Sequence, residues 1–407
     1  MRKKVCIVGL GYIGLPTAAL LANNNFEVIG VDINEKTVDI VNEGKIHIVE
    51  PGLELLVANA VSSGNLKANT IPIISDIYMI CVPTPFHENE NLHLPNIDYV
   101  VAATESISRL IKKGDLIILE STSPVGTTEI VADTLANAGV EIEDVYIAYC
   151  PERVVPGKVI EELVNNDRVV GGLNEISSKI VSNFYRQFVK GAVLETDART
   201  AEMCKLTENS FRDVNIAFAN ELSIICDKEG IDVWKLINLA NRHPRVNVLQ
   251  PGSGVGGHCI AVDPWFIIAR NPEDAKIIKS ARDVNNYKSK WVIDKIKSTA
   301  NNFTTRTGKI PTISCLGLSF KPDIDDLRES PAVNIVLSLI GENFNIKAVE
   351  PNINAHEIIQ LISYDDALKS SDIIVVLVKH KEFLDILEKI NQNVSLLDFC
   401  GIEKQNS

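Results

Sequence analysis

Residues 254–265, GVGGHCIAVDPW, concentrate side chains that could do chemistry. Glycines lead into His258 and Cys259, and Asp263 follows four residues after the cysteine. A thiol becomes a nucleophile when its neighbours stabilise the thiolate, and glycine lets a backbone pass close to a ligand. Three interpretations are therefore open: a metal site, a piece of core, or a nucleophile.

The metal and core interpretations of this stretch are the weaker ones. Adjacent side chains such as His258 and Cys259 diverge, and the chain has no second His/Cys pair at zinc-ligand spacing, so no metal is expected. Cysteine is often buried, and Ile260 to Val262 are apolar, but a glycine-rich approach is poor core material. The pattern favours a reactive Cys259, with Lys205 and His258 as possible neighbours of the thiolate.

Lys205, Asn209 and Arg212 have helical spacing and would share one face of a helix. Such spacing also fits a solvated charge stripe in which Glu202 and Glu208 pair with the cations. On a covered helix, in contrast, a lysine and an asparagine can position a polar substrate.

The helix that carries them is expected to be long. From about Asp197 the pattern is helical, with no proline or glycine until Gly230. Its length would suit a helix that joins domains or supports a dimer. Apolar residues suggest that other parts of the protein cover most of it: Cys204, Phe211, Ile216 and Phe218.

A second motif, VGLGYIG, follows the apolar run KVCIV near the N-terminus. Gly9, Gly11 and Gly14 have GxGxxG spacing, a helical pattern follows, and the next apolar run ends at Asp32. Gly9 permits a tight turn, Gly11 lets a pyrophosphate approach, and Gly14 allows close helix packing. Asp32 would accept hydrogen bonds from ribose hydroxyls and disfavour a 2′-phosphate. The whole series indicates NAD binding rather than a chance cluster of glycines or a signal peptide.

Composition narrows the class of protein. The chain has 407 residues, a net charge of −13 and 45% hydrophobic residues, typical of two or three globular domains. The negative charge argues against nucleic-acid and membrane partners, because both need a basic face. Eight cysteines without a CxxC pair are typical of reduced thiols, so a cytoplasmic location is expected.

Apolar strands alternate with helical stretches in two regions of the chain, which predicts an α/β fold with two Rossmann-like, doubly wound parallel sheets joined by a helical part. We expect an NAD-binding domain at 1–196, a helical domain at 197–303 and a smaller α/β domain at 304–407, with a connection near 304–311. Ligands bind beyond the carboxyl ends of parallel strands, where Thr84, Thr122, Glu152 and Arg153 fall, although such residues also cap strands.

Seven segments together carry a resemblance over essentially the whole chain. They are VGLGYIGLP, STSPVGT, YCPER, AEMCKLTENSFRDVNIAFANE, RHPRVN, GVGGHCIAVDP and SFKPDIDDLRESP. In this order they resemble the UDP-glucose/GDP-mannose dehydrogenase family. The resemblance implies oxidation of a sugar C6 alcohol to a carboxylate with two NAD⁺, and a dimer formed through the middle helices.

The family's mechanism implies a role for each matching residue. After the first oxidation Cys259 would capture the aldehyde as a thiohemiacetal, and the second oxidation would leave a thioester for water to hydrolyse. Lys205 would stabilise oxyanions or move protons, Asn209 would hold the oxygen, and Asp263 would orient Lys205 or activate water. Glu152 and Thr122 resemble residues that handle the water.

Binding roles carry over by the same matching. Cofactor contacts are expected, besides the motif glycines, at Tyr12, Ile13, Asp32, Thr84, Thr122 and Arg328. Taken alone, Arg328 beside Asp325 and Asp326 fits a surface ion pair. Sugar-nucleotide contacts are expected at Arg153, Val154, Lys205, Asn209, Arg212, His243, Arg245, Gly256, Phe320 and Lys321.

The same motifs indicate which sugar is the substrate and weigh against two other classes of protein. RHPRVN and GGHCIAVDPWF are most similar to members that oxidise UDP-N-acetyl-D-mannosamine for surface polysaccharides, with UDP-GlcNAc and UDP-glucose as alternatives. A β-hydroxyacid dehydrogenase would need neither Cys259 nor a third domain. A non-catalytic NAD-binding protein would not need Cys259, Lys205 and Asp263.

Overall fold

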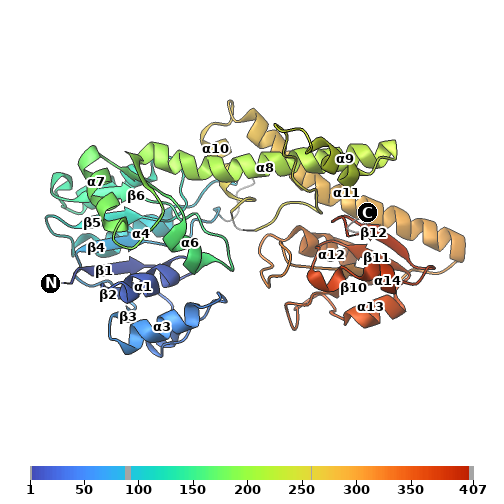
Figure 1. The fold of residues 1–407 in the computed structure, drawn as a ribbon, viewed down its shortest axis with the longest axis horizontal. Coiled ribbons are helices and arrows are strands. Elements are labelled where there is room, and N and C mark those ends of the chain that lie inside the picture. Colours follow the sequence, from blue (N-terminus) through green and yellow to red (C-terminus); the bar gives the residue numbers. More distant parts are fainter. Residues whose placement is uncertain (1, 88–92, 258, 403–407) are drawn as a thin grey trace. The chain divides into compact units, whose positions relative to one another are not determined.

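The structure, a computed structural model, describes residues 2–87, 93–257 and 259–402. The chain forms two compact units, Met1–Thr207 and Glu208–Ser407. Each unit contains one sheet, of eight strands in the first and four in the second (Figure 1). In the described part of the chain, no helix combines the length and apolar character needed to cross a membrane.

The first sheet has the strand order β3-β2-β1-β4-β5-β6-β7-β8. The order reverses between β1 and β4, and ligands of open α/β sheets bind at the carboxyl ends beside such a reversal. The strands are β1 Lys4–Val8, β2 Glu27–Val31, β3 Leu66–Asn69, β4 Ile77–Ile80, β5 Leu116–Leu119, β6 Tyr146–Tyr149, β7 Arg168–Gly172 and β8 Val193–Asp197.

One pair in this sheet differs from the expected parallel arrangement. β7 runs antiparallel to β6, with Ala148 opposite Gly172, and β8 then runs parallel to β7. An apolar run predicts a strand but not its direction, and many largely parallel sheets carry such a reversed edge.

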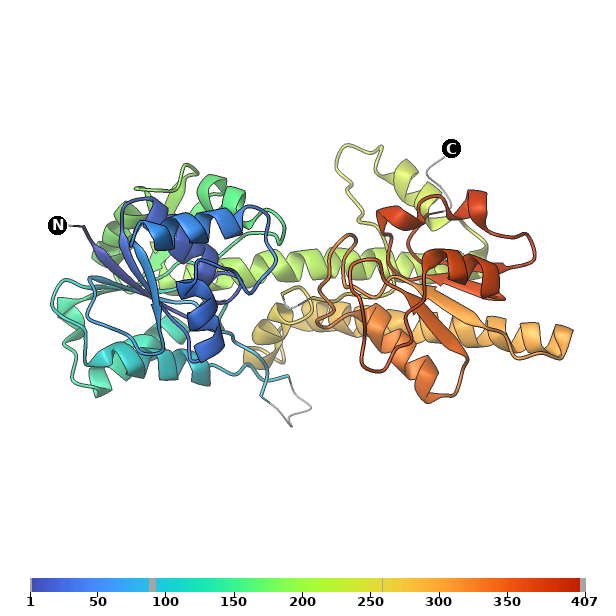
Figure 2. The same cartoon turned by 90° about the horizontal axis from the view of Figure 1, so that it is seen from below.

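Helices cover both faces of the first sheet (Figures 1 and 2). Alternate residues along each strand point to opposite faces, so β1 gives Val5 and Ile7 to one core and Cys6 and Val8 to the other. The first core includes α1 Gly14–Asn23, α2 Glu35–Asn42, α3 Leu53–Ser62, α6 Val159–Asn165 and α7 Glu175–Tyr185. The second includes α4 Asp98–Ser108 and α5 Thr127–Asn137.

The predicted long helix is confirmed as α8, Ala198–Glu229. Its start is fixed by Asp197, whose carboxylate accepts hydrogen bonds from the backbone N–H and the hydroxyl of Thr200. It ends at Gly230, which has a φ of 66°. Left-handed backbone of this kind favours glycine and terminates helices.

In the second unit, α8 packs against a second long helix, α11 (Lys276–Thr307), through buried polar contacts. Asp213 Oδ1 accepts hydrogen bonds from Arg282 Nη1 at 2.7 Å and from Asn285 Nδ2 at 2.8 Å. Two short helices complete this part: α9 Val233–Ala240 and α10 Asp263–Arg270. The predicted connection at 304–311 begins too early, because α11 continues to Thr307; its last turn is polar and lacks an apolar period.

The second sheet has the order β10-β9-β11-β12 and is parallel throughout. One face packs against α11 and α12, and the other packs against α13 and α14. The predicted strands are confirmed at β9 Ile313–Leu316, β10 Ile346–Val349, β11 Ile373–Val376 and β12 Ser395–Asp398. The helices are α12 Pro331–Gly341, α13 Tyr364–Ser370 and α14 Ile386–Lys389. The three-domain division at 196/197 and 303/304 stays a prediction.

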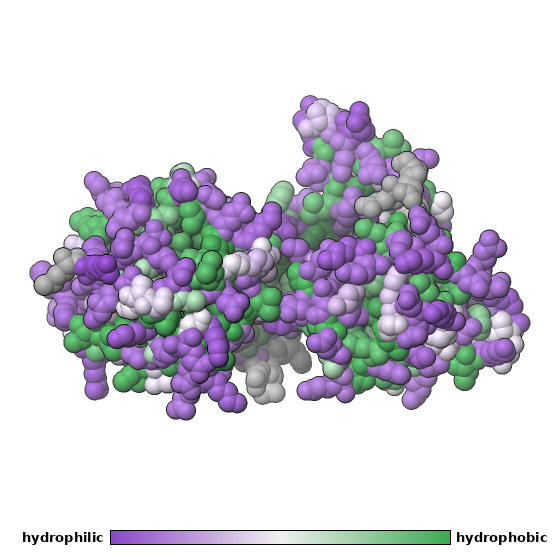
Figure 3. All heavy atoms as spheres, turned by 60° about the horizontal axis from the view of Figure 1, so that its bottom comes forward, coloured by the Kyte–Doolittle hydropathy of each residue, from purple (hydrophilic) through white to green (hydrophobic). Residues whose placement is uncertain are grey.

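The face drawn in Figure 3 is mostly hydrophilic on each unit, with scattered apolar side chains between the polar ones. A mixed surface of this kind is usual for a globular protein in water.

Candidate active site

The glycine turn after β1 has the geometry that a dinucleotide needs. Gly9 has a φ of 98°, and a Cβ there would lie 2.6 Å from the carbonyl oxygen of Cys81. A Cβ on Gly14, the first residue of α1, would lie 1.8 Å from the carbonyl oxygen of Gly9. A Cβ on Gly11 would meet nothing within 4 Å, so the backbone there faces open space. Two glycines thus serve close packing, and the middle one leaves room for a phosphate.

Asp32 follows β2 and is held beside this turn. Its Oδ2 accepts a hydrogen bond from the backbone N–H of Leu10 at 3.1 Å, and its Oδ1 accepts one from Asn34 at 2.9 Å. The carboxylate is partly exposed, so ribose hydroxyls can reach it. Tyr12 and Ile13 lie between Gly11 and α1, and the Tyr12 side chain is exposed.

Thr84 and Thr122 come together beyond the carboxyl ends of β4 and β5. The Thr84 hydroxyl donates to the carbonyl oxygen of Thr122 at 2.6 Å, and Thr84 is buried. β4 borders the reversal of strand order and β5 is its neighbour, so both loops lie on the side of the sheet where ligands of such folds bind.

Glu152 and Lys205 also meet in the first unit, through a main-chain atom. Lys205 Nζ donates to the backbone carbonyl oxygen of Glu152 at 2.6 Å, and both side chains are buried. The Glu152 carboxylate lies 3.8 Å from Arg168 Nη1 and accepts a hydrogen bond from the backbone N–H of Val154. Burial raises the pKa of Glu152, against the opposing effect of Arg168. Arg153 Nη1 donates to the carbonyl oxygen of Asp167 at 3.0 Å.

A buried polar cluster behind Glu152 was not foreseen from the sequence. Arg168 lies over the ring of Tyr185 at 5.5 Å, and the Tyr185 hydroxyl donates to Glu120 at 2.6 Å. All three are almost inaccessible to solvent. The available signal was a charged residue at the start of the apolar run DRVVGG, because a buried arginine needs carboxylate partners.

Glu202 does not belong to a solvated charge stripe. It is fully buried and accepts hydrogen bonds from the N–H groups of Gly126 and Thr128, at 2.6 and 2.8 Å, where α5 begins. Burial raises its pKa, whereas the hydrogen bonds from Thr128 and Gly126 lower it. Glu202 therefore caps α5 and holds the start of α8 within the first unit.

In the second unit, Asn209 and Asp263 are in direct contact. Asn209 Nδ2 donates to Asp263 Oδ2 at 2.5 Å, and both residues are buried. Asp263 begins α10, and its backbone N–H donates to the carbonyl oxygen of Cys259 at 2.8 Å. Cys259 is exposed, whereas His258 lies outside the described residues.

The glycines before Cys259 pack against the protein's own chain. A Cβ on Gly256 would lie 2.5 Å from the carbonyl oxygen of Glu329, and one on Gly257 would lie 2.8 Å from the Phe320 ring. Gly257 also donates its N–H to the carbonyl oxygen of Arg328 at 3.2 Å. The interpretation that ligand approach alone requires these glycines was thus incomplete, since contact with residues 320–331 already demands them.

Phe320 also borders a cavity of about 500 Å³ in the second unit. Besides Phe320, the lining includes Gly254, Ser319, Pro322 and Lys379. Clefts of this volume suit small-molecule ligands. Lys321 is exposed next to Phe320.

Cys259 differs from the cysteines of the strands in exposure. Burial raises the pKa of Cys6, Cys150 and Cys315 to about 12, so these thiols stay protonated and unreactive. Among the eight cysteines, all of them in the described part of the chain, Cys259 alone is classed as exposed. Accessibility therefore favours Cys259 as the nucleophile.

Several predicted binding residues lie on exposed surface. Arg212 is exposed on α8, and His243 and Arg245 belong to an exposed loop after α9. Arg328 forms a bidentate ion pair with Asp326. Its Nη2 lies 2.6 Å from Oδ2, and its Nε lies 3.0 Å from Oδ1. Their roles in ligand binding stay predictions.

One group among the described residues could offer three metal ligands: Asp323, His380 and Glu382. His380 Nδ1, however, already accepts a hydrogen bond from the backbone N–H of Asp323 at 2.9 Å, and the two acidic residues are exposed. The arrangement has a simpler explanation as part of a hydrogen-bond network.

Fold and site together define a nucleotide-binding oxidoreductase with a cysteine in a structured loop. Three successive parts of the chain match the UDP-glucose/GDP-mannose dehydrogenase family: its NAD binding domain at residues 3–189, its central domain at 199–287 and its UDP binding domain at 314–402. The chain belongs to this family.

Individual relatives are similar over nearly their whole length. The UDP-N-acetyl-D-mannosamine dehydrogenase of Campylobacter jejuni is 55% identical, over 98% of this chain and 99% of that protein. The NDP-N-acetyl-D-galactosaminuronic acid dehydrogenase of Ralstonia nicotianae is 52% identical, over 98% and 96%. A solved structure, the UDP-N-acetyl-mannosamine dehydrogenase Cap5O from Staphylococcus aureus, has a TM-score of 0.87 and 40% identity, over 98% and 99%.

Proposed function

We propose that this protein oxidises UDP-N-acetyl-D-mannosamine at C6 to the uronate in two NAD-dependent steps, for the synthesis of a surface polysaccharide. The observation that carries the proposal is the full-length similarity to dehydrogenases of that sugar at more than half identity. The exposed Cys259 within a family-specific loop supports the covalent route.

NAD would be held by the turn at Gly9 and Gly11, by Asp32 and by Thr84, and it supplies the hydride acceptor for both oxidations. The open space at Gly11 and the carboxylate of Asp32 fit a pyrophosphate and a ribose diol. A 2′-phosphate would be repelled by Asp32, so NAD is favoured over NADP. Further cofactor contacts are proposed at Tyr12, Ile13, Thr122 and Arg328.

Cys259 would form a covalent bond with C6 at the aldehyde stage. Its thiolate adds to the aldehyde carbon to give a thiohemiacetal, and oxidation of that adduct leaves a thioester that water cleaves. Covalent capture keeps a reactive aldehyde from escaping while the cofactor is exchanged.

Five polar residues would contact the sugar oxygen or the water. Lys205 is a cation that can stabilise the developing alkoxide, and Asn209 can donate a hydrogen bond to the same oxygen. Asp263 and Glu152 are buried carboxylates that can take protons from water, and the raised pKa of Glu152 brings it nearer to neutral pH. Thr122 is proposed to help hold the water.

The nucleotide half of the substrate would use the second sheet, which matches the family's UDP binding domain. Arginine and lysine side chains would contact the diphosphate, so a few placed cations would let an acidic protein bind an acidic ligand. The proposed contacts are Arg153, Val154, Lys205, Asn209, Arg212, His243, Arg245, Gly256, Phe320 and Lys321.

We further propose a cytoplasmic homodimer that pairs through α8. Phe211, Phe218 and Ile225 are 68%, 52% and 49% exposed in the single chain. The expectation that other parts of this chain cover α8 was therefore wrong at Phe211 and Phe218. They are seven residues apart and so lie near one line along the helix, a pattern typical of helix pairing.

A panel of nucleotide sugars tests the substrate. UDP-N-acetyl-D-mannosamine should yield two NADH per sugar and a product of the uronate mass, with little turnover of UDP-glucose. Preferential oxidation of a UDP-N-acetylgalactosamine or UDP-GlcNAc substrate would reassign the sugar, and fast turnover of UDP-glucose alone would overturn the proposal.

A further inference from the structure

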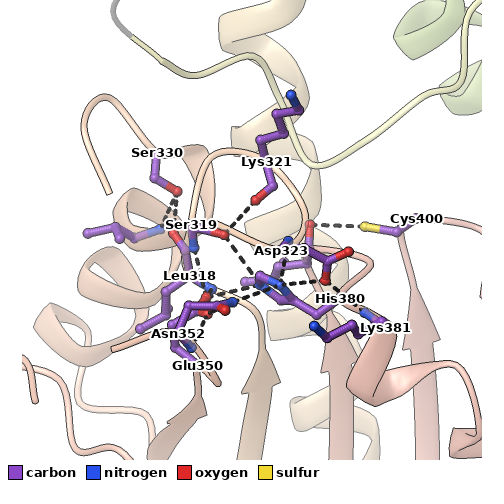
Figure 4. Close-up of polar contacts among 12 residues, drawn as sticks. Leu318, Ser319, Lys321, Asp323, Ser330, Glu350, Asn352, His380, Lys381 and Cys400 are labelled. Carbon is purple, nitrogen blue, oxygen red and sulfur yellow. Dashed lines mark hydrogen bonds and ion pairs between the residues drawn. The ribbon is translucent and has the colours of Figure 1, made fainter. Parts of the chain in front are cut away.

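A buried histidine, His380, lies behind the wall of the cavity in the second unit. It follows β11, is inaccessible to solvent, and contacts residues of three separate segments (Figure 4). The proposed chemistry leaves this side chain without a task.

The hydrogen bonds define the tautomer of His380. The backbone N–H of Asp323 donates to Nδ1 at 2.9 Å, and a backbone N–H can only donate, so Nδ1 must be unprotonated. Neutral imidazole therefore carries its proton on Nε2, which lies 3.1 Å from Glu350 Oε2 and 3.3 Å from Ser319 Oγ. The Ser319 hydroxyl donates to the carbonyl oxygen of Lys321 at 2.7 Å, which leaves its oxygen able to accept.

Glu350, at the end of β10, completes the network. Its Oε2 also accepts hydrogen bonds from the N–H groups of Leu318 and Ser319, at 2.7 and 2.9 Å. Its Oε1 accepts from the backbone N–H and the side-chain amide of Asn352, both at 3.1 Å. The carboxylate is buried and accepts all of these hydrogen bonds, which favours its charged form.

The network holds one short segment at both ends. Glu350 binds the N–H groups of Leu318 and Ser319 where the segment begins, and His380 binds the N–H of Asp323 where it ends. Between these points are Phe320 and Pro322, which line the cavity, and Lys321, whose side chain points away from His380 in Figure 4. The cavity wall is thus fixed from behind by two side chains that do not themselves line it.

We propose that His380, as a neutral imidazole protonated on Nε2, is a positioning residue that holds Phe320 and Lys321 in place for a nucleoside diphosphate. This inference rests on the proposed function, in which the two residues contact the nucleotide. His380 acts through the main chain of residues 318–323 and not by touching the ligand.

Metal binding by His380 is the competing explanation. A metal on Nδ1 would have to displace the N–H of Asp323, and its other ligands would be the exposed Asp323 and Glu382. The same hydrogen bond that excludes a metal ligand role creates the link to the cavity wall.

Calorimetric titration with UDP, on the full-length protein, tests the proposal. His380→Leu removes the contacts of the imidazole with Asp323, Glu350 and Ser319 while keeping a similar side-chain volume, so the Kd for UDP should rise about tenfold or more. The KM for the nucleotide sugar should rise in parallel, while kcat and the KM for NAD stay within about twofold of wild type. His380→Asn, whose amide oxygen can replace Nδ1 as acceptor for Asp323, should recover part of the UDP affinity.

Ser371→Ala is the matched control. Ser371 is buried under the same sheet and its hydroxyl donates to Ser314 Oγ at 2.6 Å, away from the network around His380. It should lower the melting temperature without weakening UDP binding. Equal loss of UDP affinity in Ser371→Ala and His380→Leu would overturn the positioning role and leave general destabilisation.

Nitrogen-15 spectra of histidine-labelled wild type give a readout independent of folding defects in the variants. They should show one histidine with Nε2 protonated and Nδ1 bare, absent from the spectrum of His380→Asn. Any one of three results would overturn the inference: a proton on Nδ1, unchanged UDP affinity in a folded His380→Leu, or no UDP binding by wild type. UDP binding without oxidation of UDP-N-acetyl-D-mannosamine would instead overturn only the proposed substrate.

Discussion

Asn209 Nδ2 donates a hydrogen bond to Asp263 Oδ2 across 2.5 Å, joining α8 to the first residue of α10. Both side chains are buried, so the bond is shielded from water. The partnership gives Asp263 a fixed orientation four residues past Cys259, and it gives Asn209 a fixed direction for its remaining amide proton. The pair thus behaves as one unit.

Asp263→Asn should lower kcat about a hundredfold, because an amide cannot take a proton from water or stabilise a neighbouring cation. Initial rates of NADH formation measure it. If the pair acts as a unit, adding Asn209→Ala to Asp263→Asn should cost less than the sum of the two single losses. Asn215→Ala serves as control, since its amide bonds only the Phe211 carbonyl of its own helix. Additive losses would contradict the coupling.

Cys259→Ser should reduce uronate formation about a thousandfold, because an alcohol is a poorer nucleophile than a thiolate. Product mass and NADH per sugar distinguish this from a binding defect, for which KM would change first. Cys226→Ser, a buried cysteine on α8, is the matched control and should keep wild-type stoichiometry. Full uronate production by Cys259→Ser would remove the thiol from the reaction.

Asp32→Asn should shift the preference from NAD towards NADP by about tenfold, because it removes a charge that repels a 2′-phosphate. Asparagine can still accept a hydrogen bond from Leu10, so the turn should stay intact. The ratio of kcat/KM for the two cofactors is the measurement. Asp39→Asn, on the exposed side of α2, should leave this ratio unchanged.

Glu350→Gln should destabilise the protein at pH 7 by about 3 kcal/mol. Burial raises the pKa of Glu350, but hydrogen bonds from His380 and from the N–H groups of Leu318 and Ser319 outweigh it and lower the pKa to about 2 from the usual 4.5. A lowered folded-state pKa contributes stability above pH 4.5, and this contribution is lost as the pH falls towards 2.

Urea unfolding of wild type and Glu350→Gln measures this effect. The difference between their free energies of unfolding should become smaller below pH 4.5. Glu342→Gln, which removes only an exposed ion pair with Lys297, should change stability by less than about 1 kcal/mol at every pH. A difference between wild type and Glu350→Gln that is independent of pH would show that shape, and not charge, matters at this site.

The sequence was sufficient for the features that depend on local pattern. Most strands of both sheets are apolar runs bounded by turn residues, and α8 is a helical pattern that ends at a glycine. The edge strands β3 (LKAN) and β8 (VLETD) are more polar and lack this signal. The reversed direction of β7 has no local signal, because it depends on which neighbour completes the sheet edge. Strand existence is thus encoded locally, while strand direction is a property of the assembled sheet.

The candidate site divides in the same way. Cys259 and Asp263 stand in one motif, whose glycines and thiol indicate a reactive Cys259, while the role of Asp263 is implied by the family resemblance. Arg168, behind Glu152, and His380, behind Phe320, are brought to the site by strands distant in sequence. Residues that support a site through the fold have no spacing rule, because any strand that reaches the right edge can supply them.

The exposed apolar residues Phe211, Phe218 and Ile225 of α8 give a prediction about the subunit interface. Phe218 is 52% exposed and lies seven residues from both Phe211 and Ile225, so a charge at its position would fall in the middle of a helix pairing. Phe218→Glu should convert a dimer to a monomer at micromolar concentration, measured by sedimentation equilibrium, because a buried unpaired carboxylate costs several kcal/mol. Ile176→Glu, on α7 with 63% exposure, is the control for a charge placed on an exposed apolar position and should leave the dimer intact. A monomeric wild type, or a dimer that persists in Phe218→Glu, would place the subunit contact elsewhere or remove it.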